Sequence, residues 1–114
     1  MIAVIFEAWP SAGRSAEYFD LAARLKTDLA TMDGFISVER FESLVTKGKL
    51  LSLSFWRDEE AVRAWRKLPA HREAQARGRG GVFADYRLRV ASVLRDYGMN
   101  ERDAAPADSR GAHG

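Results

Sequence analysis

The chain has 114 residues, a formal net charge of +2 and no cysteine. Its length fits a single domain with a modest hydrophobic core. Its acids and bases are nearly balanced, which argues against nucleic acid as a partner, and no apolar stretch approaches the roughly 20 residues that span a membrane. Without cysteine there is no disulfide, thiol nucleophile or cysteine-based metal site, and with no signal-peptide pattern we expect a cytoplasmic protein.

Three strands and one helix are predicted in the first half of the chain. The strands are runs of apolar and β-prone residues at Ile2 to Trp9, Phe35 to Ser43 and Leu50 to Trp56. From Arg14 to Met32 apolar residues recur every three or four positions, which is the period of an amphipathic helix. Only a short polar segment with Gly48 separates the second and third strands, so we expect a β-hairpin.

Two short helices and a last strand are predicted in the second half. Asp58 has the side chain of a helix N-cap and precedes two glutamates, whose charge the helix dipole favours. Pro69 lacks an amide proton, so it should end this helix and let another run from about Ala70 to Arg77. After a glycine-rich connector, apolar residues alternate with others from Tyr86 to Arg95, which indicates the fourth strand.

The predicted order βαββαβ is that of an α+β, ferredoxin-like fold with a four-stranded antiparallel sheet and helices on one face. The first three strands carry large apolar side chains on both faces, more than one helical layer can cover. A second copy of the sheet could cover the other face, so we expect a homodimer. This domain should occupy residues 1–98, and residues 99–114, which have little to bury, should form a disordered tail.

Several short motifs occur in an order and spacing typical of a known family. They are Asp33-Gly34-Phe35, Leu53-Ser54-Phe55-Trp56, Glu59-Glu60-Ala61, Trp65, and the stretch from His71 to Tyr86. In these features, over about residues 1–98, the chain resembles the antibiotic biosynthesis monooxygenase (ABM) family of dimeric α/β barrels. The resemblance implies a dimer in which two sheets pack together. Some relatives oxidise aromatic polyketides with oxygen and no cofactor, and others bind and cleave haem.

The chain departs from the residue patterns of both kinds of relative. The cofactor-free oxygenases place an asparagine one helical turn before the pocket tryptophan, and that position here is Ala61. Haem-degrading relatives use an asparagine from the first strand and a histidine about ten residues after the tryptophan. The position ten after Trp65 is Gln75, and the only asparagine is Asn100 in the tail.

Three residues are therefore candidates for a catalytic role: His71, Trp65 and Tyr86. Histidine titrates near neutrality, so His71 could remove a proton or ligate haem. Trp65 has the helical spacing of a core residue as well, and Tyr86 could pack or donate its hydroxyl. Candidates for ligand binding are Arg72, Arg77 and Trp56, since arginines can hold a carboxylate or phosphate.

These residues lead to three functional interpretations. The first is a cofactor-independent monooxygenase that acts on an aromatic or electron-rich small molecule, with His71 as the base and no metal. The second is a haem-binding or haem-degrading protein, with His71 as the axial ligand and arginines on the propionates. The third is a non-catalytic dimeric protein that binds a small molecule.

Overall fold

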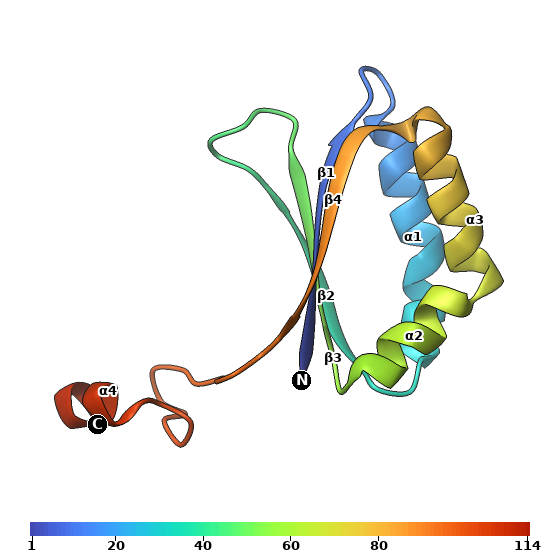
Figure 1. Ribbon diagram of the computed structural model, residues 1–114. Helices are drawn as coiled ribbons and strands as arrows, with labels where there is room; N and C mark the ends of the chain where they lie inside the picture. Colours follow the sequence, from blue (N-terminus) through green and yellow to red (C-terminus); the bar gives the residue numbers. More distant parts are fainter.

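In the computed structural model, the strands and helices of the domain follow one another in the predicted order βαββαβ, with two short helices at the second helical position (Figure 1). The structure describes the backbone of all 114 residues and their burial, apart from the burial of Ala70 and Gly78. The strands are β1 (Ile2–Pro10), β2 (Phe35–Glu42), β3 (Leu50–Trp56) and β4 (Phe83–Ser92). The helices of the folded body are α1 (Ser15–Thr31), α2 (Glu59–Lys67) and α3 (Pro69–Arg77).

The strands form one sheet in the order β2-β3-β1-β4, and every neighbouring pair is antiparallel. Helices α1, α2 and α3 lie on the same side of this sheet (Figure 1). The predicted ferredoxin-like α+β fold is therefore confirmed, whereas the pairing of two sheets stays a prediction. Among the described residues, no helix is long and apolar enough to cross a membrane.

Local signals in the sequence place α2 and α3. The Asp58 carboxylate accepts a hydrogen bond from the Ala61 amide at 2.9 Å, as expected of an N-cap. Leu68 has an extended backbone, with φ −63° and ψ 137°, because a residue before proline avoids the helical region. The second helix then begins at Pro69, so the chain changes direction between α2 and α3 just before His71.

Gly34 fixes the turn that brings α2 close to the start of β2. Its φ is +84°, a region that favours glycine, and a Cβ atom here would lie 2.6 Å from the Cβ of Ala61. The Gly34 carbonyl also accepts a hydrogen bond from the Arg57 amide at 2.7 Å. A side chain at this position would therefore push α2 away from the sheet.

The core consists of two clusters of buried residues between the helices and the sheet. One contains Leu29, Trp56, Ala61, Val62 and Trp65, at the end of the sheet under α2. The other contains Ala8, Tyr18, Leu21 and Val82, near the end of α3. Side chains from both clusters line the space between them, which is described as the candidate site below.

Strand β4 begins earlier than the alternating pattern predicted. Phe83 is already in the strand because its ring packs against Phe6 and Tyr18, with 5.5 Å between centroids in each pair. The glycine-rich connector forms a π-helical turn at Gly78–Val82, which a hydrogen bond from the Ser11 amide to the Val82 carbonyl holds at 2.8 Å. These contacts join residues that are far apart in the sequence, so the alternation of residues along β4 could not predict where the strand begins.

The face of the sheet away from the helices is apolar around one group of ion pairs. Because Val4 and Phe6 point toward the helices, Ile5 points the other way, as do its neighbours Leu53 and Phe55. On the same face Glu7 pairs with Lys49 and Arg89, which lower the pKa of the carboxyl group. This face is the surface on which we expect the second copy to pack.

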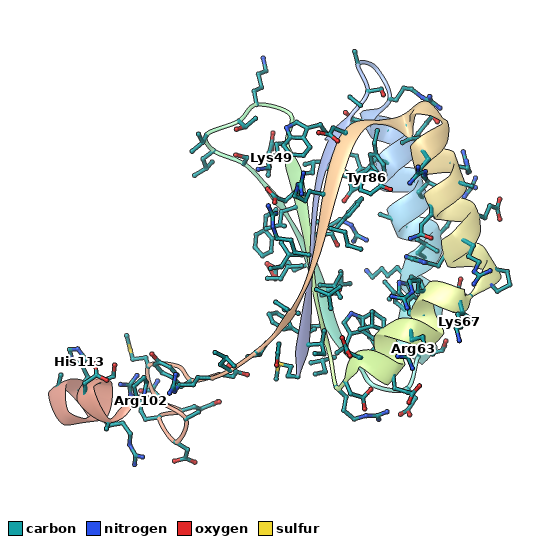
Figure 2. The ribbon with its side chains drawn as sticks, viewed as in Figure 1. Lys49, Arg63, Lys67, Tyr86, Arg102 and His113 are labelled. Atoms are coloured by element: carbon teal, nitrogen blue, oxygen red, sulfur yellow. The ribbon has the colours of Figure 1, made fainter. Side chains whose placement is uncertain are left out.

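The segment after β4 folds on itself, away from the sheet and the helices (Figure 1). It contains a short helix, α4 (Ala107–His113), where the sequence analysis expected disorder over residues 99–114. The Arg102 side chain lies within the segment (Figure 2) and organises it, since it donates to the carbonyls of Gly98 at 3.1 Å and Gly114 at 2.7 Å. The structure describes this local order, and both the domain of residues 1–98 and the character of residues 99–114 as a tail stay predictions.

Removing residues 99–114 is expected to leave the domain folded, because the hydrogen bonds of Arg102 stay within residues 98–114. The free energy of unfolding should fall by less than about 1 kcal/mol, which corresponds to about 4–8 °C in a domain of this size. Thermal unfolding of the full and shortened chains measures the difference. A larger loss would show that the segment docks on the domain or on a second copy.

Candidate functional site

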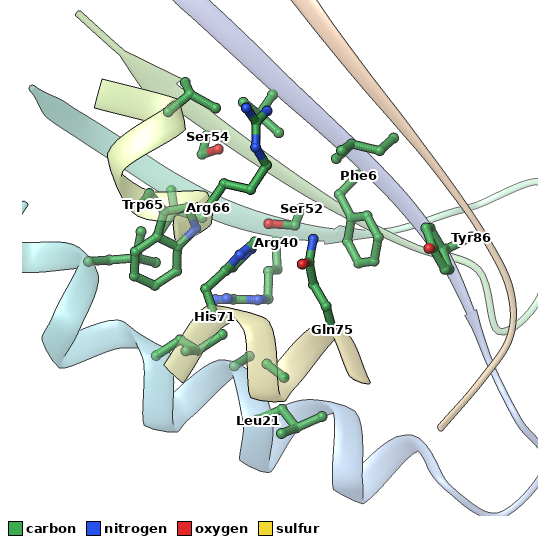
Figure 3. A pocket seen from close by; sticks show the side chains of 18 of the residues that line it. Phe6, Leu21, Arg40, Ser52, Ser54, Trp65, Arg66, His71, Gln75 and Tyr86 are labelled. Carbon is green, nitrogen blue, oxygen red and sulfur yellow. The ribbon is translucent and has the colours of Figure 1, made fainter. Parts of the chain in front are cut away.

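A cavity of about 220 Å³ lies between the helices and the sheet (Figure 3). All four strands and helices α1, α2 and α3 contribute to its walls. It is larger than the roughly 150 Å³ engineered cavity that binds benzene in another protein. A compact organic molecule therefore fits between the helices and the sheet.

The sheet forms a floor that is polar at one side and apolar at the other. One row across the sheet reads Arg40 on β2, Ser52 on β3, Phe6 on β1 and Leu88 on β4, because these residues pair directly across the strands. The adjacent row follows the same trend and reads Val38, Ser54, Val4 and Val90. Within these two rows the Arg40 guanidinium and the serine hydroxyl groups thus gather on β2 and β3.

The helices place Trp65 and His71 over this floor (Figure 3). Their ring centroids are 5.0 Å apart, and the Trp65 ring is 6.2 Å from that of Trp56. Trp65 is only 8% exposed and belongs to the core cluster, so it packs and also lines the cavity. The position of Trp65 is therefore compatible both with packing in the core and with contact to a ligand.

His71 lies at the cavity with a ring that burial keeps neutral. Burial lowers the pKa of its imidazole below the ordinary 6.5, more than a backbone hydrogen bond at Arg66 raises it. Its Nδ1 atom is buried and has no hydrogen-bond partner among the described residues. At pH 7 the ring is therefore uncharged, and this nitrogen is free to accept a proton from a ligand.

Of the candidates from the sequence, His71, Trp65, Tyr86 and Trp56 line the cavity. The Tyr86 ring lies 5.6 Å from that of Phe6, and its hydroxyl accepts a hydrogen bond from Arg79 at 3.2 Å near the edge of the sheet. Trp56 is 1% exposed, and its indole nitrogen donates to Ser54 at 2.9 Å. Trp56 therefore contributes shape to the cavity, since its only donor is already used.

Arg72 and Arg77 lie outside the cavity. Both are exposed on α3, and Arg77 lines a smaller hollow beside acidic Asp28 and Glu73. The helix turns His71, Ala74 and Gln75 toward the cavity, and Arg72 and Arg77 lie on its exposed side. Neither arginine is placed to hold a ligand in the cavity.

The sequence analysis missed Arg40 and Ser52 as parts of the site. Arg40 alternates in phase with Val38, which faces the helices, so the strand pattern already placed a charged residue on an apolar face. Ser52 likewise alternates in phase with Leu50 and Trp56. An arginine or serine within the buried set of a strand was the signal that could have identified them.

The cavity does not fit haem in this form. Its volume of about 220 Å³ is below the range of about 300–1,000 Å³ typical of sites for drug-sized ligands. His71 offers the single axial nitrogen that haem iron needs, so the volume of the cavity and not its ligands argues against haem. The residues present favour a small organic ligand.

Replacing Trp65 with phenylalanine is expected to lower the free energy of unfolding by about 1–3 kcal/mol, because the smaller ring leaves a gap in the core. Thermal unfolding measures this loss, and Trp9→Phe is the matched control, since Trp9 is outside the cavity. If Trp65 only packs, ligand binding should not change. A loss of ligand affinity beyond the loss of stability would show that the indole contacts the ligand.

Comparisons with known proteins agree with this architecture. The family model described as "Antibiotic biosynthesis monooxygenase" matches residues 1–77. A protein of Pyricularia oryzae named "Jasmonate monooxygenase ABM" is 46% identical over 101 residues, which are 89% of this chain and 47% of that protein. The chain thus spans about half the length of this relative.

Two solved structures show the same fold at low sequence identity. One is a putative antibiotic biosynthesis monooxygenase from Deinococcus radiodurans, with a TM-score of 0.77, 17% identity, and coverage of 86% of this chain and 97% of that one. The other is SnoaB, a cofactor-independent oxygenase from Streptomyces nogalater, with a TM-score of 0.69, 15% identity, and coverage of 83% and 95%. Both likenesses concern the fold.

Proposed function

Because the chain belongs to the antibiotic biosynthesis monooxygenase family, we propose that it is a monooxygenase whose substrate is an electron-rich small molecule held in the cavity. The observation that carries the proposal is the half-buried His71 beside Trp65, whose buried Nδ1 atom has no partner among the described residues in a largely apolar cavity. A base in such a place can form a reactive anion away from water. No cofactor is required by this scheme.

In the proposed reaction, Nδ1 of His71 accepts the proton of a phenolic or enolic hydroxyl group. The resulting anion is electron-rich and gives electrons to O2, and one oxygen atom forms a bond to the ring carbon. The hydrogen on that carbon and the proton held by His71 leave with the other oxygen atom as water, so a phenol becomes a quinone. Apolar walls that exclude water keep the anion from being reprotonated by solvent.

The proposal includes a homodimer in the cytoplasm. The dimer would cover the apolar outer face of the sheet without closing the cavity, which lies on the helical side. It is supported by the apolar side chains on that face, including the half-exposed Ile36 and Phe41. The haem-binding alternative would need the cavity to enlarge.

Oxygen consumption by the purified protein tests the proposal. We expect uptake of O2 with an enolisable aromatic such as anthrone, and incorporation of isotopically labelled oxygen into the product without added metal or cofactor. Jasmonate is the second substrate to test, because the Pyricularia relative is named for it.

Three results would contradict the proposal. Binding of these molecules without oxygen uptake indicates the non-catalytic interpretation. Oxygen uptake that a metal chelator abolishes indicates that a metal does the chemistry. A visible haem spectrum that depends on His71 indicates the haem-binding interpretation.

A further inference from the structure

We propose that the cavity recognises a carboxylate through Arg40, so that the ligand is a compact apolar molecule with a single carboxylate at one end. The inference deepens the proposed function and rests on it only in taking the cavity as the substrate site. It arises from the charge of Arg40 within the cavity, which no acidic side chain among the described residues balances.

Arg40 stands out among the arginines because it lines the cavity from β2, is partly shielded from water and has no acidic partner. Its Nε atom is buried with no hydrogen-bond partner among the described residues. The other arginines pair with carboxylates, as does Arg14 with Glu17, lie exposed, or donate to backbone carbonyls, as does Arg102. None of the ion pairs found in the described part of the chain contains Arg40, and no aspartate or glutamate is among the residues that line the cavity.

An unbalanced guanidinium in a largely apolar cavity calls for an anion from outside the protein. An arginine carries a permanent positive charge, and Arg40 is half-buried with its Nε shielded from water, so part of its lost hydration is not offset within the described residues. A ligand with a permanent negative charge removes this cost as soon as it binds. An anion that exists only during the reaction would leave Arg40 unpaired in the resting complex, so a carboxylate fits better than a transient enolate.

The neighbours of Arg40 fit a carboxylate as well. Ser52 pairs directly across from Arg40 on β3, so the two Cβ atoms are about 4.5–5.5 Å apart and both side chains lie on the cavity side. A guanidinium fork and a hydroxyl group can together bind both oxygen atoms of one carboxylate. Arg66, the other arginine at the cavity, is exposed, and its guanidinium points away from His71 and Ser52 (Figure 3).

The rest of the cavity fits an apolar body. From Arg40 on β2, the floor continues through Phe6 to Leu88 and Val90 on β4, the strand at the opposite edge of the sheet. Leu88 is 49% and Val90 45% exposed although both line the cavity, which indicates that the cavity opens at this edge. Three strand spacings separate β2 from β4, which is about 14 Å. The carboxylate would bind at the β2 edge of the floor, beside Arg40, and the apolar body would extend toward the opening at the β4 edge.

The test compares 4-phenylbutyrate with its methyl ester, which has the same apolar body without the charge. Binding is followed by isothermal titration calorimetry and by the fluorescence of Trp56 and Trp65, which line the cavity. We expect the native protein to bind the acid at least about tenfold more tightly than the ester, a difference of about 1.4 kcal/mol. Arg40→Gln should abolish this preference, and Arg40→Lys should keep part of it because the charge remains.

Arg63→Gln is the matched control, because Arg63 is exposed on α2, pairs with Glu60 and lies outside the cavity. It removes the same charge from the surface and should leave the preference for the acid unchanged. Thermal unfolding shows whether Arg40→Gln folds. If Arg40→Gln does not fold, two other measurements test the inference. They are the ratio of acid to ester affinity in the native protein and the same ratio in Arg40→Lys.

Equal affinity for the acid and the ester in the native protein, or an unchanged preference in Arg40→Gln, would overturn the inference. Because 4-phenylbutyrate has no phenolic or enolic hydroxyl group, its binding does not depend on oxygen chemistry. Arg40-dependent binding without oxygen uptake on any substrate would support the inference and contradict the proposed function. Oxygen uptake that is the same in the native protein and in Arg40→Gln, with acids and esters alike, would support the proposed function and contradict the inference.

Discussion

Replacing His71 with alanine is expected to lower turnover by about 10²- to 10⁴-fold, the usual contribution of a positioned general base. The side chain lies in the first turn of α3 over the cavity, and its Nδ1 is buried without a partner. Losing it therefore removes the only neutral nitrogen base among the residues described as lining the cavity. The measurement is the initial rate of oxygen uptake under saturating substrate.

Stability should respond much less than turnover to this change. His71 makes no ion pair among the described residues, and burial disfavours its charged form, so alanine should cost about 1 kcal/mol or less. Glu73→Ala, on the same helix and outside the cavity, is the control for general effects on α3. Turnover that survives in His71→Ala, with the fold intact, would show that another group removes the proton.

The pH dependence gives an independent check on His71. Its folded pKa is below 6.5, so the imidazole is neutral at pH 7 and can act as a base. The value of kcat/KM should therefore be constant above pH 6.5 and fall as the pH drops through the folded pKa. The same shift means that the unfolded chain binds the proton more readily, so the contribution of His71 to stability is complete above pH 6.5 and is lost at lower pH.

Placing glutamate at Ile5 is expected to convert a dimer into a monomer. Ile5 lies on the face of the sheet away from the helices, between Val4 and Phe6, which line the cavity. If two such faces pack together, the new carboxylate is buried twice, once in each copy, without a partner. A cost of several kcal/mol for each unpaired charge predicts a loss of affinity between copies of at least about 10³-fold.

Sedimentation at micromolar concentration measures the mass of the native protein and of Ile5→Glu. Ala23→Glu adds the same side chain at an exposed position of α1 and should leave the mass unchanged. A native protein that is already monomeric, or an Ile5→Glu variant that stays dimeric, would contradict the expected interface. In the first case, another partner or solvent must cover the apolar face.

The sequence determined the elements of the fold because their signals are local. Asp58 caps α2, and Pro69 separates α2 from α3, each through a contact or restriction within a few residues. Alternation in the strands likewise fixed which residues share a face. The same signals brought His71 to the start of a helix, and the position of Trp65 in its helix followed from the apolar spacing.

Only the tertiary structure decided which polar residues meet. Arg40 and Ser52 become neighbours through the register of β2 with β3, and the cavity above them depends on how far α2 and α3 stand from the sheet. In the sequence, Arg72 and Arg77 were candidates for ligand binding, but the rotation of α3 about its axis leaves both side chains exposed to solvent. Register and rotation are set by packing between distant segments, such as Phe83 on Tyr18, and no local pattern of residues encodes them.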